Sequence, residues 1–135
     1  MQSDNTLRFL ATEHIKRLHD HSIKRHGGSF GIRGEGLLES AVSMPSQTFG
    51  GVYLHATLGA KAVAYLFHLC QNHAFIDGNK RIALLACEVF LLLNGRELSL
   101  SSKEAEDMVM RVAEGVLSKE DLTALVEKSI QLKRK

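Results

Sequence analysis

The chain has 135 residues, and its 44% hydrophobic content predicts one globular domain with a single core and excludes a disordered protein. A net charge of +2 is too small to favour direct binding of nucleic acid. The first ten residues lack the basic and apolar zones of a signal peptide, and the most apolar stretch, 82–93, is too short to cross a bilayer. We therefore expect a cytoplasmic protein without a membrane partner.

The first predicted helix covers residues 12–26, and Gly27 ends it after a basic last turn. Its few apolar positions indicate a helix at the surface. It contains four histidines, namely His14, His19, His21 and His26. Their spacings miss the i, i+4 pairing that two metal ligands on one helix face require. We interpret these histidines as a solvated face, and a metal site is the less favoured alternative.

A glycine-rich segment follows, with five glycines in residues 27–36, and it predicts a loop that bends sharply or moves. A phosphate-binding loop is disfavoured, because no Gly-Lys-Ser/Thr follows and no strand precedes the segment. A short helix is expected over 37–44, with Pro45 ending it. Residues 48–51 then turn the chain.

Two central helices are predicted next. Apolar residues at helical spacing cover 58–72, and small residues there allow close approach of another helix. Residues 82–93 are expected to form the buried central helix. Its one charge is Glu88, for which two interpretations stay open: a gap in the bundle surface, or a basic or hydroxyl partner. Cys70 and Cys87 lie in these helices and indicate small buried hydrophobes rather than a disulfide or a metal pair.

Two further amphipathic helices are expected after an extended link over 96–100. Ser101 with Glu104, and Ser118 with Asp121, have the spacing of a capping box at the start of each helix. The apolar positions that should face the core are Ala105, Met108, Val109, Val112 and Val116, then Leu122, Leu125, Val126 and Leu132.

The elements together define the predicted fold. No strand of any length is convincing, so we expect an all-α, single-domain bundle of about six helices over residues 1–135. The ends, 1–11 and 133–135, are expected to be frayed.

The loop between the two central helices carries the chemistry. Its sequence is His73-Ala74-Phe75-Ile76-Asp77-Gly78-Asn79-Lys80-Arg81. Gly78 and Asn79 fall where the second helix begins, so free backbone N–H groups and the positive end of the helix dipole should face the loop. Lys80 and Arg81 oppose that dipole at a cost of about 0.3–1 kcal/mol each, which is understandable if a polyphosphate anion binds here.

The remaining polar groups of the loop fit the same chemistry. Asp77 can hold Mg²⁺ against phosphates, and His73 can take a proton from an attacking hydroxyl near neutral pH. Each residue alone is more simply interpreted as a surface residue. Their crowding into nine positions between apolar helices is what favours a site.

The segment resembles the signature of the Fic/Doc family, His-x-Phe-x-Asp-Gly-Asn-(Gly or Lys)-Arg. It is similar to the Doc branch, the death-on-curing proteins, which carry Lys at the eighth place. Doc-like spacings also recur outside the loop, and the resemblance covers most of residues 12–130. These outlying matches are Gly36-Leu37-Leu38-Glu39-Ser40-Ala41, Pro45, Thr48-Phe49-Gly50-Gly51, Phe90-Leu91 and Asn94-Gly95.

The resemblance implies a Fic/Doc-like bundle whose active-site loop leads into the buried central helix. It also implies transfer of part of a nucleoside triphosphate, ATP with Mg²⁺, onto a hydroxyl side chain of another protein. The implied roles are then carried over by position. They are general base for His73, Mg²⁺ ligand for Asp77, phosphate cradle for the Gly78 backbone and Asn79, transition-state stabilisation for Lys80 and Arg81, and anchor for Phe75. Residues 27–36 are then expected to be a flap beside the motif that docks the target chain, with a flexible connector as the alternative.

Two departures from AMP-transferring Fic enzymes bear on the group transferred. Those enzymes have Gly in place of Lys80 and a second Arg in place of Leu84. A Lys side chain fills the room for the β- and γ-phosphates, and Leu84 cannot bind an anion. The resemblance therefore implies a nucleotide with its γ-phosphate toward His73 and transfer of phosphate.

The Doc branch further implies a toxin of a toxin–antitoxin pair, which phosphorylates elongation factor Tu and halts protein synthesis. A self-inhibitory helix needs the pattern Ser/Thr-x-x-x-Glu-Gly/Asn, but Gly31 and Met110 stand where Ser or Thr is required. We therefore expect an antitoxin that acts in trans. Transfer of AMP or another nucleotide, and a non-catalytic interaction module with the same fold, remain the alternatives.

Overall fold

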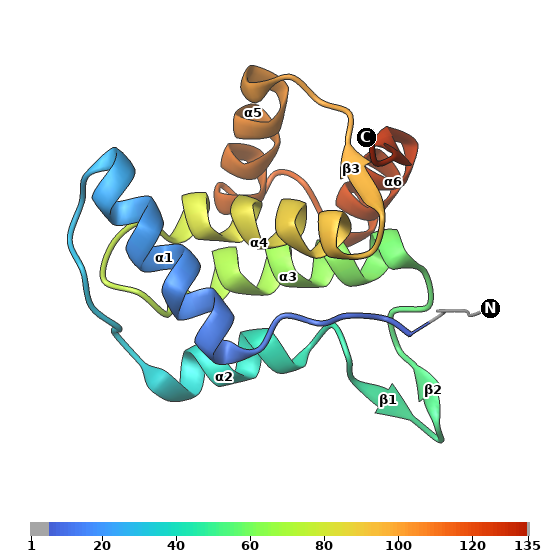
Figure 1. The fold of residues 1–135 in the computed structure, drawn as a ribbon, viewed down its shortest axis with the longest axis horizontal. Helices are drawn as coiled ribbons and strands as arrows, with labels where there is room; N and C mark the ends of the chain where they lie inside the picture. Colours follow the sequence, from blue (N-terminus) through green and yellow to red (C-terminus); the bar gives the residue numbers. More distant parts are fainter. Residues whose placement is uncertain (1–5, 135) are drawn as a thin grey trace.

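The computed structural model describes residues 6–134, which form six helices and two small antiparallel sheets (Figure 1). The helices are α1 Thr12–His26, α2 Glu35–Ser43, α3 Leu58–Asn72, α4 Asn79–Leu93, α5 Ser102–Ala113 and α6 Lys119–Ser129. The strands are β1 Thr48–Phe49, β2 Val52–Tyr53, β3 Arg96–Leu98 and β4 Ile130–Leu132. The predicted mostly helical bundle is confirmed, and the short strands are additions that the sequence analysis did not anticipate. Within residues 6–134, no helix combines the length and the apolar character needed to cross a membrane.

Helices α3 and α4 lie side by side at the centre of the bundle, and the other helices pack around them (Figure 1). Both are lined by fully buried apolar side chains, including Tyr65, Leu66, Ile82 and Phe90. The Thr57 side chain caps α3 by accepting a hydrogen bond from the Ala60 N–H at 3.0 Å. This closely packed pair positions the two ends of the loop that joins α3 to α4.

Helix boundaries agree closely with the sequence patterns. Helix α2 begins at Glu35, two residues before the expected start, and the capping box of Ser101 and Glu104 starts α5 as expected. Ser118 caps α6 by accepting from the Asp121 N–H. The prediction was wrong for two apolar positions, because Val116 is 63% exposed beyond the end of α5, and Leu132 is 70% exposed in β4.

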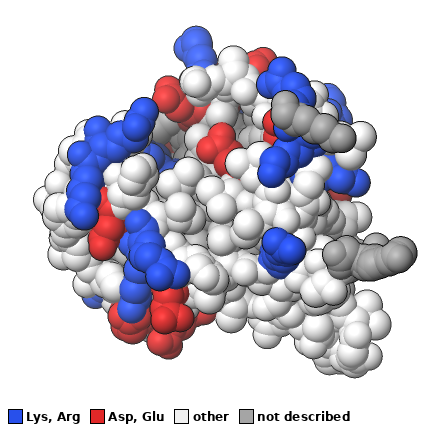
Figure 2. Space-filling model, viewed as in Figure 1, with Lys and Arg blue, Asp and Glu red and all other residues white. Residues whose placement is uncertain are grey.

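Glu88 lines an open groove of about 680 Å³ between α4, β3 and the start of α5. The side chain is half-buried, and burial raises the pKa of its carboxyl. It has no hydrogen-bond or ion-pair partner among residues 6–134. Figure 2 shows acidic side chains in the hollow above α4, with basic side chains around it. Of the two interpretations of Glu88, a gap in the bundle surface is therefore the one that the structure supports.

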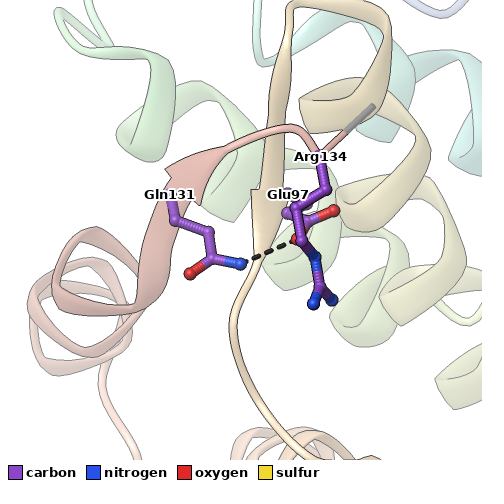
Figure 3. Close-up of polar contacts among 3 residues, drawn as sticks. All are labelled: Glu97, Gln131 and Arg134. Atoms are coloured by element: carbon purple, nitrogen blue, oxygen red, sulfur yellow. Dashed lines mark hydrogen bonds and ion pairs between the residues drawn. The ribbon is translucent and has the colours of Figure 1, made fainter.

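Both chain ends are tied to the bundle within the described residues. Near the start, the Tyr65 hydroxyl accepts from the Leu10 N–H at 2.7 Å and donates to the Leu10 carbonyl oxygen at 3.0 Å. At the other end, strand β4 pairs with β3, and Glu97 accepts hydrogen bonds from Gln131 and Arg134 at 2.7 and 3.0 Å. Figure 3 shows the first of these bonds, with Arg134 beside it. The fraying expected of 1–11 and 133–135 stays a prediction, and 1–5 and 135 lie outside the described residues.

Candidate active site

His73 ends α3 and stands at the entrance of the loop. Its backbone is left-handed, with φ 50° and ψ 50°. Between residues 6 and 134, no other non-glycine residue has a positive φ. The Arg33 guanidinium stabilises this ending by donating to the carbonyl oxygens of His73 at 2.7 Å and Asn72 at 3.1 Å. These carbonyls lack partners inside the helix, so Arg33 satisfies them and holds an exposed His73 in place.

The middle of the loop is anchored in the core as expected, because Phe75 is only 2% exposed. Asn79 braces the same point. Its side-chain oxygen accepts from the Phe75 N–H at 3.0 Å, and its side-chain nitrogen donates to the Phe75 carbonyl oxygen at 2.9 Å. Both ends of the Asn79 amide are therefore used to hold the loop, and the backbone N–H is what Asn79 offers to a phosphate.

Asp77 is exposed, and its carboxylate is held by two backbone donors. The Ser29 N–H donates to Oδ2 at 3.0 Å, and the Gly78 N–H donates to Oδ1 at 2.8 Å. These two hydrogen bonds, with a smaller contribution from the charge of Arg81, lower the pKa of Asp77, so the carboxylate is ionised at neutral pH. The Gly78 N–H was expected to be free for an anion, and this expectation is wrong because Asp77 accepts it.

The first turn of α4 keeps the other donors. Gly78 is the N-cap with φ 74°, and the N–H groups of Asn79, Lys80 and Arg81 have no acceptor among residues 6–134. The Lys80 and Arg81 side chains are exposed and form no ion pair with a described residue. This helix end therefore concentrates positive charge that no ion pair neutralises among the described residues.

A groove of about 400 Å³ adjoins Lys80 and Arg81, between α4 and α5. The other side chains that line it are Leu84, Glu106, Val109 and Met110. The wall is mostly apolar, and its one carboxylate faces the same space as the two cations. This lining contains no second arginine, because Leu84 stands at the position where AMP-transferring Fic enzymes have one.

The glycine-rich segment lies against the loop, as Figure 1 shows for the chain between α1 and α2. Ile32 pairs with Phe75 in an antiparallel bridge, and the Arg33 N–H donates to the Ala74 carbonyl oxygen at 2.7 Å. Gly28 has φ 116°, a backbone conformation that favours glycine, and a Cβ atom there would lie 2.8 Å from Asp77 Oδ2. The expected position beside the motif is confirmed, and the role as a flap stays a prediction.

His19 reaches the same loop from α1. It is 1% exposed, its ring stacks on Phe75 with centroids 3.8 Å apart, and its Nε2 lies 2.8 Å from the Asp77 carbonyl oxygen. The interpretation of the four histidines as a solvated face was therefore wrong for His19. Its i, i+4 spacing from Ile15 and to Ile23, both buried, was the signal that could have placed it inside.

Residues 6–134 contain no group of three or more His, Cys, Asp or Glu side chains that could hold a metal ion. Asp77 nevertheless fits Mg²⁺, because this ion keeps several waters and commonly takes one or two carboxylates together with substrate phosphates. The free N–H groups and the two cations at the start of α4 fit the phosphates of a nucleotide.

Comparisons with known proteins match the part of the chain that contains this loop. The Fic/DOC family model matches residues 9–91, which include α1, the glycine-rich segment and the whole loop. The chain is 43% identical over 89 residues to "Toxin Doc" of Mycolicibacterium smegmatis, covering 64% of this chain and 68% of that protein. It is 31% identical over 113 residues to "Protein kinase doc" of Escherichia phage P1, covering 83% of this chain and 87% of that protein.

Proposed function

This chain belongs to the Fic/Doc family, and we propose that it is a Doc-type toxin that phosphorylates a protein. The proposed reaction moves the γ-phosphate of ATP to a hydroxyl side chain of elongation factor Tu in the cytoplasm, which halts translation. One observation carries the proposal. A single loop holds an exposed histidine, an ionised carboxylate and an unneutralised cationic helix end within nine residues.

The residues divide the chemistry among them. Asp77 would hold Mg²⁺ and the N-terminus of α4 would hold the phosphates of ATP, and the ion would neutralise part of the phosphate charge. The His73 imidazole accepts the proton of the target hydroxyl, whose oxygen forms the new bond to the γ-phosphorus while the bond to the ADP oxygen breaks. Lys80, Arg81 and the free backbone N–H groups stabilise the negative charge that spreads over the transferring group.

Two side chains support transfer of phosphate over transfer of AMP. Lys80 occupies the first turn of α4, where a small residue would leave room for the β- and γ-phosphates. Leu84 lines the adjoining groove together with Glu106, and neither side chain attracts an anion. A nucleotide that enters with its γ-phosphate toward His73 does not need Leu84 or Glu106 to bind its phosphates. AMP transfer requires the opposite orientation and is the second candidate.

The family also bears on how the activity is controlled. A curated relative is named Toxin Doc, and a toxin must be restrained by its own cell. The chain lacks the complete self-inhibitory pattern, because Gly31 and Met110 occupy the Ser/Thr positions. We propose an antitoxin that binds in trans. Expression of the chain alone should arrest growth, expression of His73→Ala should not, and growth arrest by both would contradict a catalytic toxin.

The direct test is the intact mass of elongation factor Tu after incubation with this protein, Mg²⁺ and ATP. We expect one added phosphate, which His73→Ala abolishes and the exposed α1 variant His21→Ala retains. Addition of AMP would contradict the orientation argued from Lys80 and Leu84. No added mass on elongation factor Tu, with phosphate found on another protein of the lysate, would contradict the target but not the reaction.

A further inference from the structure

His19 contacts the active-site loop at two points at once. Its ring lies nearly parallel to Phe75, at an interplanar angle of 10°, and its Nε2 approaches the carbonyl oxygen of Asp77. A carbonyl oxygen can only accept, so Nε2 carries the proton and donates to it. The His19 side chain therefore contacts both Phe75, which anchors the loop, and the peptide group between Asp77 and Gly78.

That peptide group controls two parts of the site. It links Asp77 to Gly78, so its orientation sets where the Asp77 side chain points and how α4 begins. Gly78 is left-handed, and a Cβ atom there would lie 3.2 Å from Ile23 Cδ1 and 3.5 Å from His19 Nε2. The turn is thus packed directly against α1, and a rotation of this peptide would disturb the carboxylate and the first turn together.

Packing alone does not account for a histidine at this place. A phenylalanine or leucine would fill the same space beside Phe75 without burying a polar group, which costs free energy unless the group is hydrogen-bonded. The one partner that offsets this cost for Nε2 is the Asp77 carbonyl oxygen. The polar Nε2 atom of His19 therefore has its hydrogen-bond partner in the loop and not in the surrounding core.

We propose that His19 is a positioning residue for phosphotransfer, which holds the Asp77–Gly78 peptide so that the carboxylate and the start of α4 share one fixed geometry. This inference rests on the proposed function for its catalytic consequence, and on the contacts alone for its structural part. In the proposed reaction, His19 contacts neither the phosphates nor the target protein. It acts through Asp77 and Gly78.

The test compares His19→Phe, which keeps the stacking and the volume, with His19→Gln, which keeps an N–H donor. Amide hydrogen exchange of Ser29 and Gly78 reports the loop, because both N–H groups donate to the Asp77 carboxylate. We expect exchange of these two amides to be about tenfold faster in His19→Phe, as the loss of one hydrogen bond allows. The Ala86 amide in the core of α4 should be unchanged, and His19→Gln should restore wild-type exchange.

Kinetics of the same variants give the second measurement. His19→Phe should lower kcat while the melting temperature stays near that of the wild type, and His19→Gln should recover most of kcat. The exposed variant His21→Phe is the matched control and should change neither. If His19→Phe does not fold, His19→Met replaces it, since a flexible apolar chain fills the space without a donor.

The outcomes separate this inference from the proposed function. Equal exchange of Ser29 and Gly78 in wild type and His19→Phe would overturn it, as would a loss in His19→Gln as large as in His19→Phe. If the wild-type protein transfers no phosphate while His19→Phe still exchanges faster, the proposed reaction is wrong and the positioning role stands.

Discussion

Two pairs of cationic side chains differ in their exposure and in their hydrogen-bond acceptors, although neither pair has a carboxylate partner within residues 6–134. Lys80 and Arg81, the active-site pair, are exposed at the start of α4. Lys61 and Lys119, the inner pair, donate to neutral acceptors. Lys61 reaches the carbonyl oxygens of His55 and Ala56 at 2.6 and 3.2 Å and lies over the Tyr53 ring.

Lys119 completes the contrast, because its ammonium nitrogen lies 2.9 Å from Nε2 of both His55 and His68. Burial lowers the pKa of Lys61 and of Lys119, yet each has two neutral acceptors. The inner pair thus has acceptors within the fold, whereas the side chains of Lys80 and Arg81 have none among residues 6–134. A lysine or arginine without a carboxylate partner is therefore informative about function only when no neutral group accepts its hydrogen bonds.

The largest effect is expected in the active-site pair. Arg81→Ala should lower kcat/KM for phosphotransfer by about 10²- to 10³-fold, because a charge-stabilising donor of the transition state is removed. Its melting temperature should stay the same or rise slightly, since a cation in a first turn costs about 0.3–1 kcal/mol. Steady-state kinetics and thermal unfolding measure both, with Lys24→Ala at the exposed end of α1 as control. Retained activity with a clearly lower melting temperature would place Arg81 with the structural cations.

The inner pair should respond in the opposite way. Lys61→Met leaves two carbonyl oxygens without their charged donor, and we expect a loss of about 1.5–3 kcal/mol in the free energy of unfolding. Denaturant unfolding measures this loss, and phosphotransfer per folded molecule should be unchanged. Exposed Lys128→Met is the matched control. A Lys61→Met protein with wild-type stability but without activity would remove the distinction between the two pairs.

A third effect is gradual and concerns pH. Burial, with the nearby Lys119 charge, lowers the pKa of His68 to about 4 and lowers that of His55 as well. The unfolded chain therefore binds more protons than the folded protein between pH 6.5 and 4, so stability is complete above pH 6.5 and falls as the pH drops through this window. The slope is at most about 1.4 kcal/mol per pH unit for each histidine.

Unfolding curves measured across this pH range check the prediction. His68→Gln keeps an acceptor for Lys119 but cannot titrate, so its stability should depend less on pH than that of the wild type. His21→Gln, on the exposed face of α1, should keep the wild-type slope. An unchanged slope in His68→Gln would show that the acid sensitivity arises elsewhere.

Patterns local in the chain were enough for much of the fold and for the composition of the site. The helical period gave α3 with its observed ends, and the motif gave His73, Asp77, Lys80 and Arg81 as neighbours. The Phe75 anchor is confirmed by its burial. These predictions succeeded because a helix or a short motif is specified by residues within a few positions of one another.

Other parts of the site depend on residues remote in the chain. His19 contacts a carbonyl 58 positions away, and Arg33 caps the end of α3 from 40 positions away. Both side chains donate to backbone carbonyl oxygens, which every residue type carries. The residue types of the loop therefore do not reveal these contacts. The Asn79 amide likewise bonds to backbone atoms, those of Phe75, and the residue types of the loop do not show this pairing.

By itself, then, the sequence determined six helices, the order of the loop residues and the family. Only the tertiary structure decided which donors remain free, which histidine is buried, and why glycine is favoured at Gly28 where the segment passes Asp77. The physical reason is that hydrogen-bond satisfaction and close approach are properties of surfaces brought together by folding. Local propensity does not encode them until α1 and the glycine-rich segment are placed against the loop.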